Sequence, residues 1–138
     1  MKKSWGLTRK ILSGQKTCEE RWYKTKRPPF GIAKAGDIIY FKDSGEPVSI
    51  KAKITKVLQF DNLTPEKSAE IASKYAKADL GTDEIPSAIK DYTSHKNYCV
   101  IIFFDEVEQI APFAIDKTGF GAMSAWLCVS DINKIKKR

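Results

Sequence analysis

The sequence predicts a small α+β domain, in which several strands form a curled sheet or barrel flanked by two helices. Three observations predict this class. Residues 48–60 alternate between apolar and polar side chains, residues 97–110 contain the most apolar run, and residues 64–81 have the pattern of a helix. The chain of 138 residues suits one domain, 1–138, in which residues 132–138 form a basic tail.

The first elements are a short helix and a strand. "LTRKILSG" predicts a helix in which Thr8 caps the start and Ile11 and Leu12 pack inward. Gly14 fits the left-handed position after the end of this helix. A strand is expected from Lys16 to Trp22.

A basic loop then separates this strand from two others. Residues 23–36 contain two adjacent prolines and two glycines, which prevent regular structure. Residues 36–42 are expected to form a strand behind a Gly-Asp turn, and residues 43–47 to form a second turn. In the strand over 48–60, alternation buries Val48, Ile50, Ala52 and Ile54.

The second half of the chain begins with the longer helix. Thr64 is a good N-cap, Pro65 suits the first turn, and Gly81 ends the element. Residues 79–97 are expected to be mostly loop and residues 97–110 a central strand. Residues 112–129 predict short strands around a glycine-rich turn.

The net charge and its distribution along the chain indicate the kind of partner that the protein binds. The chain has a net charge of +7, and residues 1–60 carry 14 Lys and Arg against 5 Asp and Glu, a surplus of +9. A concentrated basic surplus favours a polyanion, nucleic acid first. No apolar segment is long enough to span a membrane, and no secretory signal peptide is expected.

Cysteine and histidine usage bears on compartment and cofactors. The three scattered cysteines suggest a reducing interior, so the chain is expected in the cytoplasm. It is also expected to be a monomer. One histidine and no CxxC spacing argue against a zinc site, so no metal and no cofactor are expected.

The stretch "SGQKTCEERW", residues 13–22, concentrates charged side chains near the start of the chain. On a strand, Thr17, Glu19 and Arg21 share one face, and Cys18, Glu20 and Trp22 share the other. These charged side chains form either a row of exposed ion pairs, each stabilising the fold by about 0–1 kcal/mol, or the wall of a binding site. In a site, the carboxylate would accept from an exocyclic amine, while Lys and Arg hold a carbonyl or phosphate.

Gly14, Lys16, Glu19 and Arg21 match all four positions of GxKxxExR, and the sequence resembles the ASCH domain family of the PUA-like superfamily over about residues 5–130. The resemblance implies a PUA-like mixed β-barrel with flanking helices and a cleft lined by the motif. It also implies binding of RNA or another nucleic acid.

Further ligand-binding candidates lie outside the motif. Residues 21–30 interleave basic and aromatic side chains, an arrangement in which cations follow phosphates and rings stack on bases. The glycine-rich turn is a second candidate segment. It forms either the wall of a ligand pocket or a plain turn between strands. The candidates in these two segments are Tyr23, Lys24, Lys26, Arg27, Lys117 and Phe120.

Two functions are therefore expected as alternatives. The first is a module that binds RNA or single-stranded nucleic acid, with recognition of an ordinary or modified base. The second is an amidohydrolase acting on an acylated nucleoside such as acetylated cytidine, with Lys16 and Glu19 catalytic and Thr17 a candidate nucleophile. The hydrolases of the resembling family carry threonine where this chain has Glu19, and they use a further glutamate, for which Glu66 and Glu70 are the candidates. That departure favours binding without catalysis.

Overall fold

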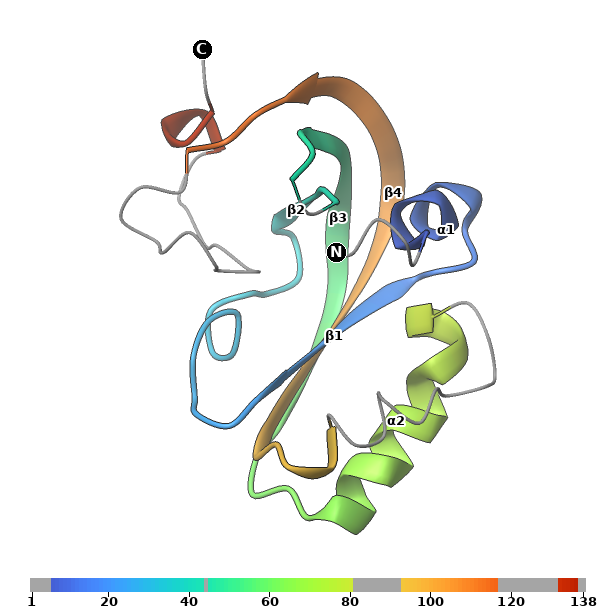
Figure 1. The fold of residues 1–138 in the computed structure, drawn as a ribbon, viewed down its shortest axis with the longest axis vertical. Coiled ribbons are helices and arrows are strands. Elements are labelled where there is room, and N and C mark those ends of the chain that lie inside the picture. The colour runs from blue at the N-terminus through green and yellow to red at the C-terminus, as the bar shows by residue number, and fades with distance from the viewer. Residues whose placement is uncertain (1–5, 44, 81–92, 117–131, 137–138) are drawn as a thin grey trace.

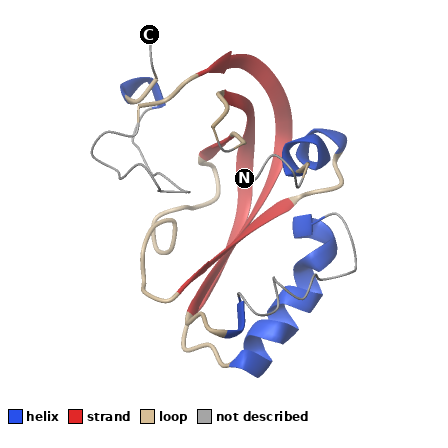
Figure 2. Ribbon diagram, in the orientation of Figure 1, coloured by secondary structure: helices blue, strands red, loops and turns tan. Residues whose placement is uncertain are grey.

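The structure is a computed structural model that describes residues 6–43, 45–80, 93–116 and 132–136. Its elements are α1 (Leu7–Ser13), β1 (Cys18–Tyr23), β2 (Ile38–Phe41), β3 (Val48–Phe60), α2 (Pro65–Leu80) and β4 (Tyr98–Phe113). A 3-10 helix, Ile132–Lys134, lies within the segment expected to be a basic tail, and the next residue, Ile135, is buried. Figure 1 and Figure 2 show a long curved β3–β4 ribbon, with α1 beside its upper part and α2 beside its lower part.

The four strands form one antiparallel sheet in the order β1-β4-β3-β2. The α+β class is therefore confirmed, but within the described residues the sheet is open and not a closed, mixed barrel. The reason lies in strand length. β1 pairs with residues 98–103 at the start of β4, whereas β2 pairs with residues 50–53, near the other end of the ribbon. The two edge strands thus lie at opposite ends of the ribbon and do not meet.

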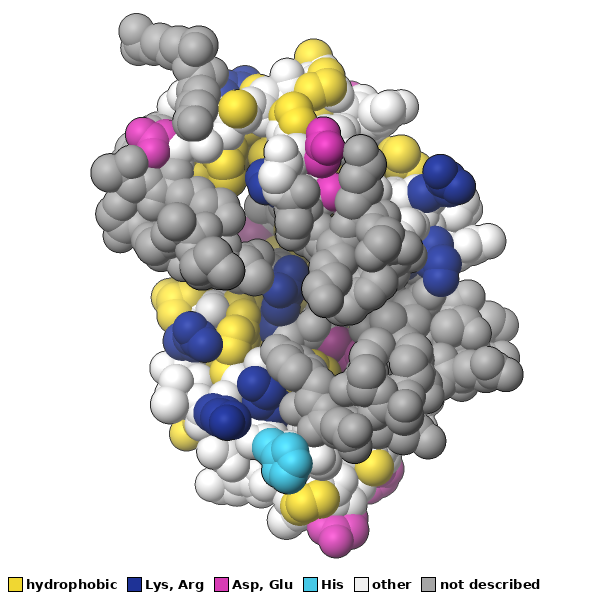
Figure 3. Space-filling view, viewed as in Figure 1, with side chains coloured by type: hydrophobic (Ala, Val, Ile, Leu, Met, Phe, Trp, Pro, Cys, Tyr) yellow, Lys and Arg dark blue, Asp and Glu magenta, His cyan; other side chains and the backbone are white. Residues whose placement is uncertain are grey.

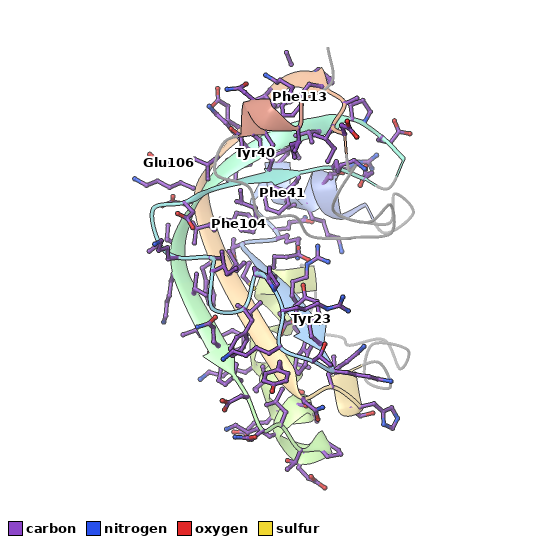
Figure 4. The ribbon with its side chains drawn as sticks, turned by 90° about the vertical axis from the view of Figure 1, so that its left-hand side faces the viewer. Tyr23, Tyr40, Phe41, Phe104, Glu106 and Phe113 are labelled. Carbon is purple, nitrogen blue, oxygen red and sulfur yellow. The ribbon has the colours of Figure 1, made fainter. Side chains whose placement is uncertain are left out.

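Bulges curve this ribbon. The β3–β4 register shifts at three places, between Val48 and Ile50, between Lys51 and Lys53, and between Ile54 and Lys56. Glu106 has a φ of 49°, the left-handed conformation that lets two residues of one strand oppose one of the other. In Figure 4, Phe41 and Phe104 lie on the inner side of the bend and Glu106 lies on the outer side.

The sheet packs a separate core on each face. The inner face carries α1 and the loop 24–36, over a cluster that comprises Ile11, Ile39, Phe41, Ile50, Ala52, Ile54, Val100, Ile102 and Phe104. The outer face carries α2, over Cys18, Trp22, Ile71, Ala72, Cys99 and Ile101. The predicted alternation of β3, with Val48, Ile50, Ala52 and Ile54 buried, is confirmed.

Several details of the two helices differ from expectation. Gly6, and not Thr8, stands at the N-cap of α1, and the Thr8 hydroxyl donates instead to the Asp43 carboxylate at 3.1 Å. Leu12 is 44% exposed, whereas its neighbour Ile11 is fully buried in the core. Thr64 does cap α2, since its hydroxyl accepts from the Lys67 N–H at 3.2 Å.

The central strand also continues further than expected. β4 extends through Pro112 to Phe113, which pairs with Val48. Residues 117–129 of the segment predicted to form a glycine-rich turn, including Lys117 and Phe120, lie outside the described residues, as does Gly81.

Candidate functional site

The candidate site begins at the turn between α1 and β1. Gly14 has a φ of 82°, a conformation that glycine adopts without steric cost, and its N–H caps the Ile11 carbonyl at 3.2 Å. The turn brings the Lys16 N–H onto the Lys10 carbonyl at 3.0 Å. At the end of the turn, the Thr17 carbonyl accepts from the Phe104 N–H at 3.2 Å, which docks the start of β1 on β4. The backbone on which Lys16 stands is therefore fixed at both ends.

Lys16 is buried, with 1% of its surface exposed. Its Nζ donates to the Cys18 carbonyl at 2.8 Å and lies 3.1 Å from the Glu19 Oε2. The ammonium therefore binds the backbone of β1 and the Glu19 carboxylate at the same time. Lys16 thus holds Glu19 in position.

Glu19 is bound on its other side by Arg21. Arg21 Nη2 lies 3.3 Å from Glu19 Oε1, and the Arg21 side chain is 20% exposed. Burial by itself raises the pKa of Glu19, but the Lys16 ammonium and the Arg21 guanidinium together hold that pKa below its usual range. The carboxylate is therefore a fixed negative charge between two cations.

The motif residues share the predicted face of β1. Glu19 stands opposite Ile102 and Arg21 opposite Val100, and both of these apolar residues belong to the inner core. Trp22 and Cys18 point to the other face, toward α2. Alternation had placed Glu19 and Arg21 together, and the structure adds Lys16 to them.

The basic loop continues this face beyond the motif. Tyr23 is half-buried at the end of β1, and the Arg27 guanidinium lies 5.0 Å from the centre of its ring. Lys26 lies 5.5 Å from the Phe30 ring, which packs edge-on against Tyr98 at 5.5 Å. The Gly31 N–H donates to the Gln59 side chain and so ties the loop to β3. Cations and rings therefore follow one another from Arg21 to Phe30.

Two residues that the sequence did not single out join this loop. Asn97 donates its side-chain N–H to the Lys24 carbonyl at 2.9 Å and its backbone N–H to the Tyr23 carbonyl at 3.0 Å. Partial burial lowers the pKa of Lys96, and the charges of Lys24 and Arg27 lower it further. Figure 3 shows Lys and Arg side chains gathered near the histidine on this side of the molecule. No local pattern signals these contacts, because 73 positions separate Asn97 from Lys24.

The structure brings Lys16 and Glu19 together, but it does not bring the candidates for the further glutamate to them. Glu66 and Glu70 are exposed on α2, which covers the outer face of the sheet, whereas Glu19 lies on the inner face. Glu70 instead approaches Lys67 at 3.7 Å. The Thr17 side chain is exposed. Among the described residues, no three His, Cys, Asp or Glu side chains are grouped to hold a metal ion, and no helix is long and apolar enough to cross a membrane.

The fold is similar to that of ASCH proteins of known structure. The crystal structure of ASCH from Zymomonas mobilis matches with a TM-score of 0.60 at 17% identity, over 83% of this chain and 69% of that one. A tyrosine-to-phenylalanine mutant of that protein matches with a TM-score of 0.60 at 17% identity, over 83% of this chain and 71% of that one. A serine-to-alanine mutant matches with a TM-score of 0.57 at 17% identity, over 78% of this chain and 67% of that one. No family model and no curated protein matches the sequence. The likeness shows a shared fold, as the sequence resemblance implied.

Proposed function

We propose that the chain is a binding module for single-stranded nucleic acid, RNA in particular, and that the ligand lies along the inner face of β1. One observation carries the proposal. The ion cluster of Lys16, Glu19 and Arg21 is continuous, on one face, with the basic and aromatic loop that begins at Tyr23. A strand of nucleic acid needs both parts, because cations bind its phosphates and rings stack on its bases.

Glu19 supplies the means to recognise a base. A carboxylate accepts hydrogen bonds from the exocyclic amine of a base. Lys16 and Arg21 hold the side chain in position, and an ionised carboxylate has about four acceptor sites, more than these two contacts use. A base with an exocyclic amine would add a hydrogen bond to Glu19, whereas uracil, which lacks that amine, would not.

The test is equilibrium binding of fluorescein-labelled oligonucleotides by fluorescence anisotropy. We expect single-stranded RNA to bind at low salt and its affinity to fall with added KCl, with a slope of about −0.7 in log–log form for each phosphate contacted. Duplex RNA of the same sequence should bind more weakly, because its bases are stacked and paired. If neither single-stranded nor duplex RNA nor DNA binds at low salt, the proposal is wrong.

A further inference from the structure

We propose that Lys24, Arg27 and Lys96 form a phosphate-binding subsite, positioned by Asn97, which anchors a strand whose base lies against Glu19. The inference deepens the proposed function and rests on it for the identity of the ligand. It assigns Lys96, a residue from the turn before β4, to the same site as the loop after β1.

The backbone holds these cations together. Asn97 binds the carbonyls of Tyr23 and Lys24, so the turn that carries Lys96 is tied to the start of the basic loop. Arg27 folds back over the Tyr23 ring, which returns its guanidinium toward the same place. Three cations from segments more than 60 positions apart are thus brought to one end of the sheet.

The cluster also concentrates like charges. In the described part of the chain, the ion pairs formed at Glu19, Glu108 and Glu70 involve neither Lys24 nor Arg27. The charges of Lys24 and Arg27 both disfavour the charged form of Lys96, so the three cations repel one another. A bound anion relieves this repulsion, and a phosphate accepts bonds both from a planar guanidinium and from ammonium groups.

The distance between Glu19 and the cluster sets the size of a ligand that contacts both. Glu19 and Tyr23 are four residues apart on β1, which at about 3.3 Å per residue places the cluster about 13 Å from the Glu19 position. A free nucleoside carries no phosphate and engages only the Glu19 end. The ligand class that uses both ends is therefore a phosphate-bearing strand.

The test compares single variants with a matched control. Lys24→Gln, Arg27→Gln and Lys96→Gln should each weaken binding of a labelled twelve-nucleotide single-stranded RNA by about fivefold and reduce the salt slope by about 0.7. Lys74→Gln is the control, because Lys74 also lies over a ring, that of Tyr75 at 5.5 Å, but on α2. It should leave both quantities unchanged. Lys96→Arg should retain the affinity.

A second measurement tests the subsite without RNA. Titration of the ¹⁵N-labelled chain with inorganic phosphate should shift the amide signals of Lys24, Arg27 and Asn97 more than those of Lys74 and Tyr75, relative to sodium chloride of equal ionic strength. RNAs with a 5′-phosphate and a 5′-hydroxyl distinguish the source: tighter binding of the former assigns the subsite to a terminal phosphate, and equal binding assigns it to the backbone.

These measurements distinguish a failure of the proposed function from a failure of the phosphate subsite. If phosphate shifts these amides and RNA does not bind, the subsite stands and the nucleic-acid proposal falls. If RNA binds the three variants as tightly as it binds Lys74→Gln, and phosphate shifts no amide in the cluster, the subsite is overturned and the proposed function stands.

Discussion

Lys16 and Glu19 form an ion pair of 3.1 Å with only 1% and 9% of their side chains exposed. Such a pair differs from the row of exposed ion pairs that the sequence left as an alternative. Two charges removed from water must compensate each other, so the pair fixes the start of β1 as well as the chemistry of its inner face.

The first prediction concerns the stability of this pair. Glu19→Leu should lower the free energy of unfolding by about 3–5 kcal/mol, because it leaves the Lys16 ammonium buried without its carboxylate. Lys16→Met should cost less, since Glu19 keeps Arg21 at 3.3 Å. Urea denaturation followed by circular dichroism measures both. A loss below about 1 kcal/mol for Glu19→Leu would mean that the pair behaves as a surface pair.

The second prediction concerns pH. The pKa of Glu19 lies below its ordinary value of 4.5, so the unfolded chain binds this proton more readily than the folded chain. The stabilisation by the carboxylate is therefore complete above the unfolded pKa and is lost as pH falls through the folded pKa. The difference in unfolding free energy between the wild type and Glu19→Gln should narrow as pH falls from 7 into this acidic range. A constant difference would contradict the assigned ion pairs.

The third prediction separates the turn from the ligand site. Gly14→Ala should lower the free energy of unfolding by about 1–2 kcal/mol, because alanine disfavours a φ of 82° although a Cβ would meet no atom within 4 Å. RNA affinity, measured below the melting range of the variant, should be unchanged. A loss of affinity with unchanged stability would assign Gly14 to the ligand contact instead.

The fourth prediction concerns base preference. RNA rich in cytosine or adenine should bind more tightly than oligouridine, by about 1–3 kcal/mol for a base that engages Glu19. Glu19→Gln should reduce that preference, because an amide both donates and accepts and so discriminates less. Fluorescence anisotropy titrations of the wild type and of Glu19→Gln measure this base preference. An equal preference in the two proteins would remove Glu19 from base recognition.

The fifth prediction addresses the hydrolase alternative. We expect no release of acetate from acetylated cytidine, because a carboxylate whose pKa is held low is a poor proton acceptor at neutral pH. Chromatographic separation of the acetylated and free nucleosides measures turnover. Turnover that Lys16→Ala abolishes without a change in melting temperature would establish the enzyme and contradict a binding-only module.

The periodicity of apolar and polar residues along the sequence predicted most of this fold. The alternation of β3 and the two faces of β1 follow from side-chain direction along an extended chain, and Gly14 and Thr64 carry the expected caps. The burial of Lys16 could not be predicted, because it lies in a turn where alternation does not set direction. Lys96 was missed because its place beside Lys24 depends on a tertiary contact.

The most direct test of the central claim is photo-crosslinking of single-stranded RNA that contains 4-thiouridine, followed by mass spectrometry of the linked peptides. We expect crosslinks at Tyr23 or Phe30, which lie on the inner face and in its loop. Tyr75 and Phe103 pack against the outer core under α2, at 5.8 Å from each other, and serve as internal controls. Crosslinks confined to Tyr75 or Phe103 would place the RNA on the wrong face and contradict the account.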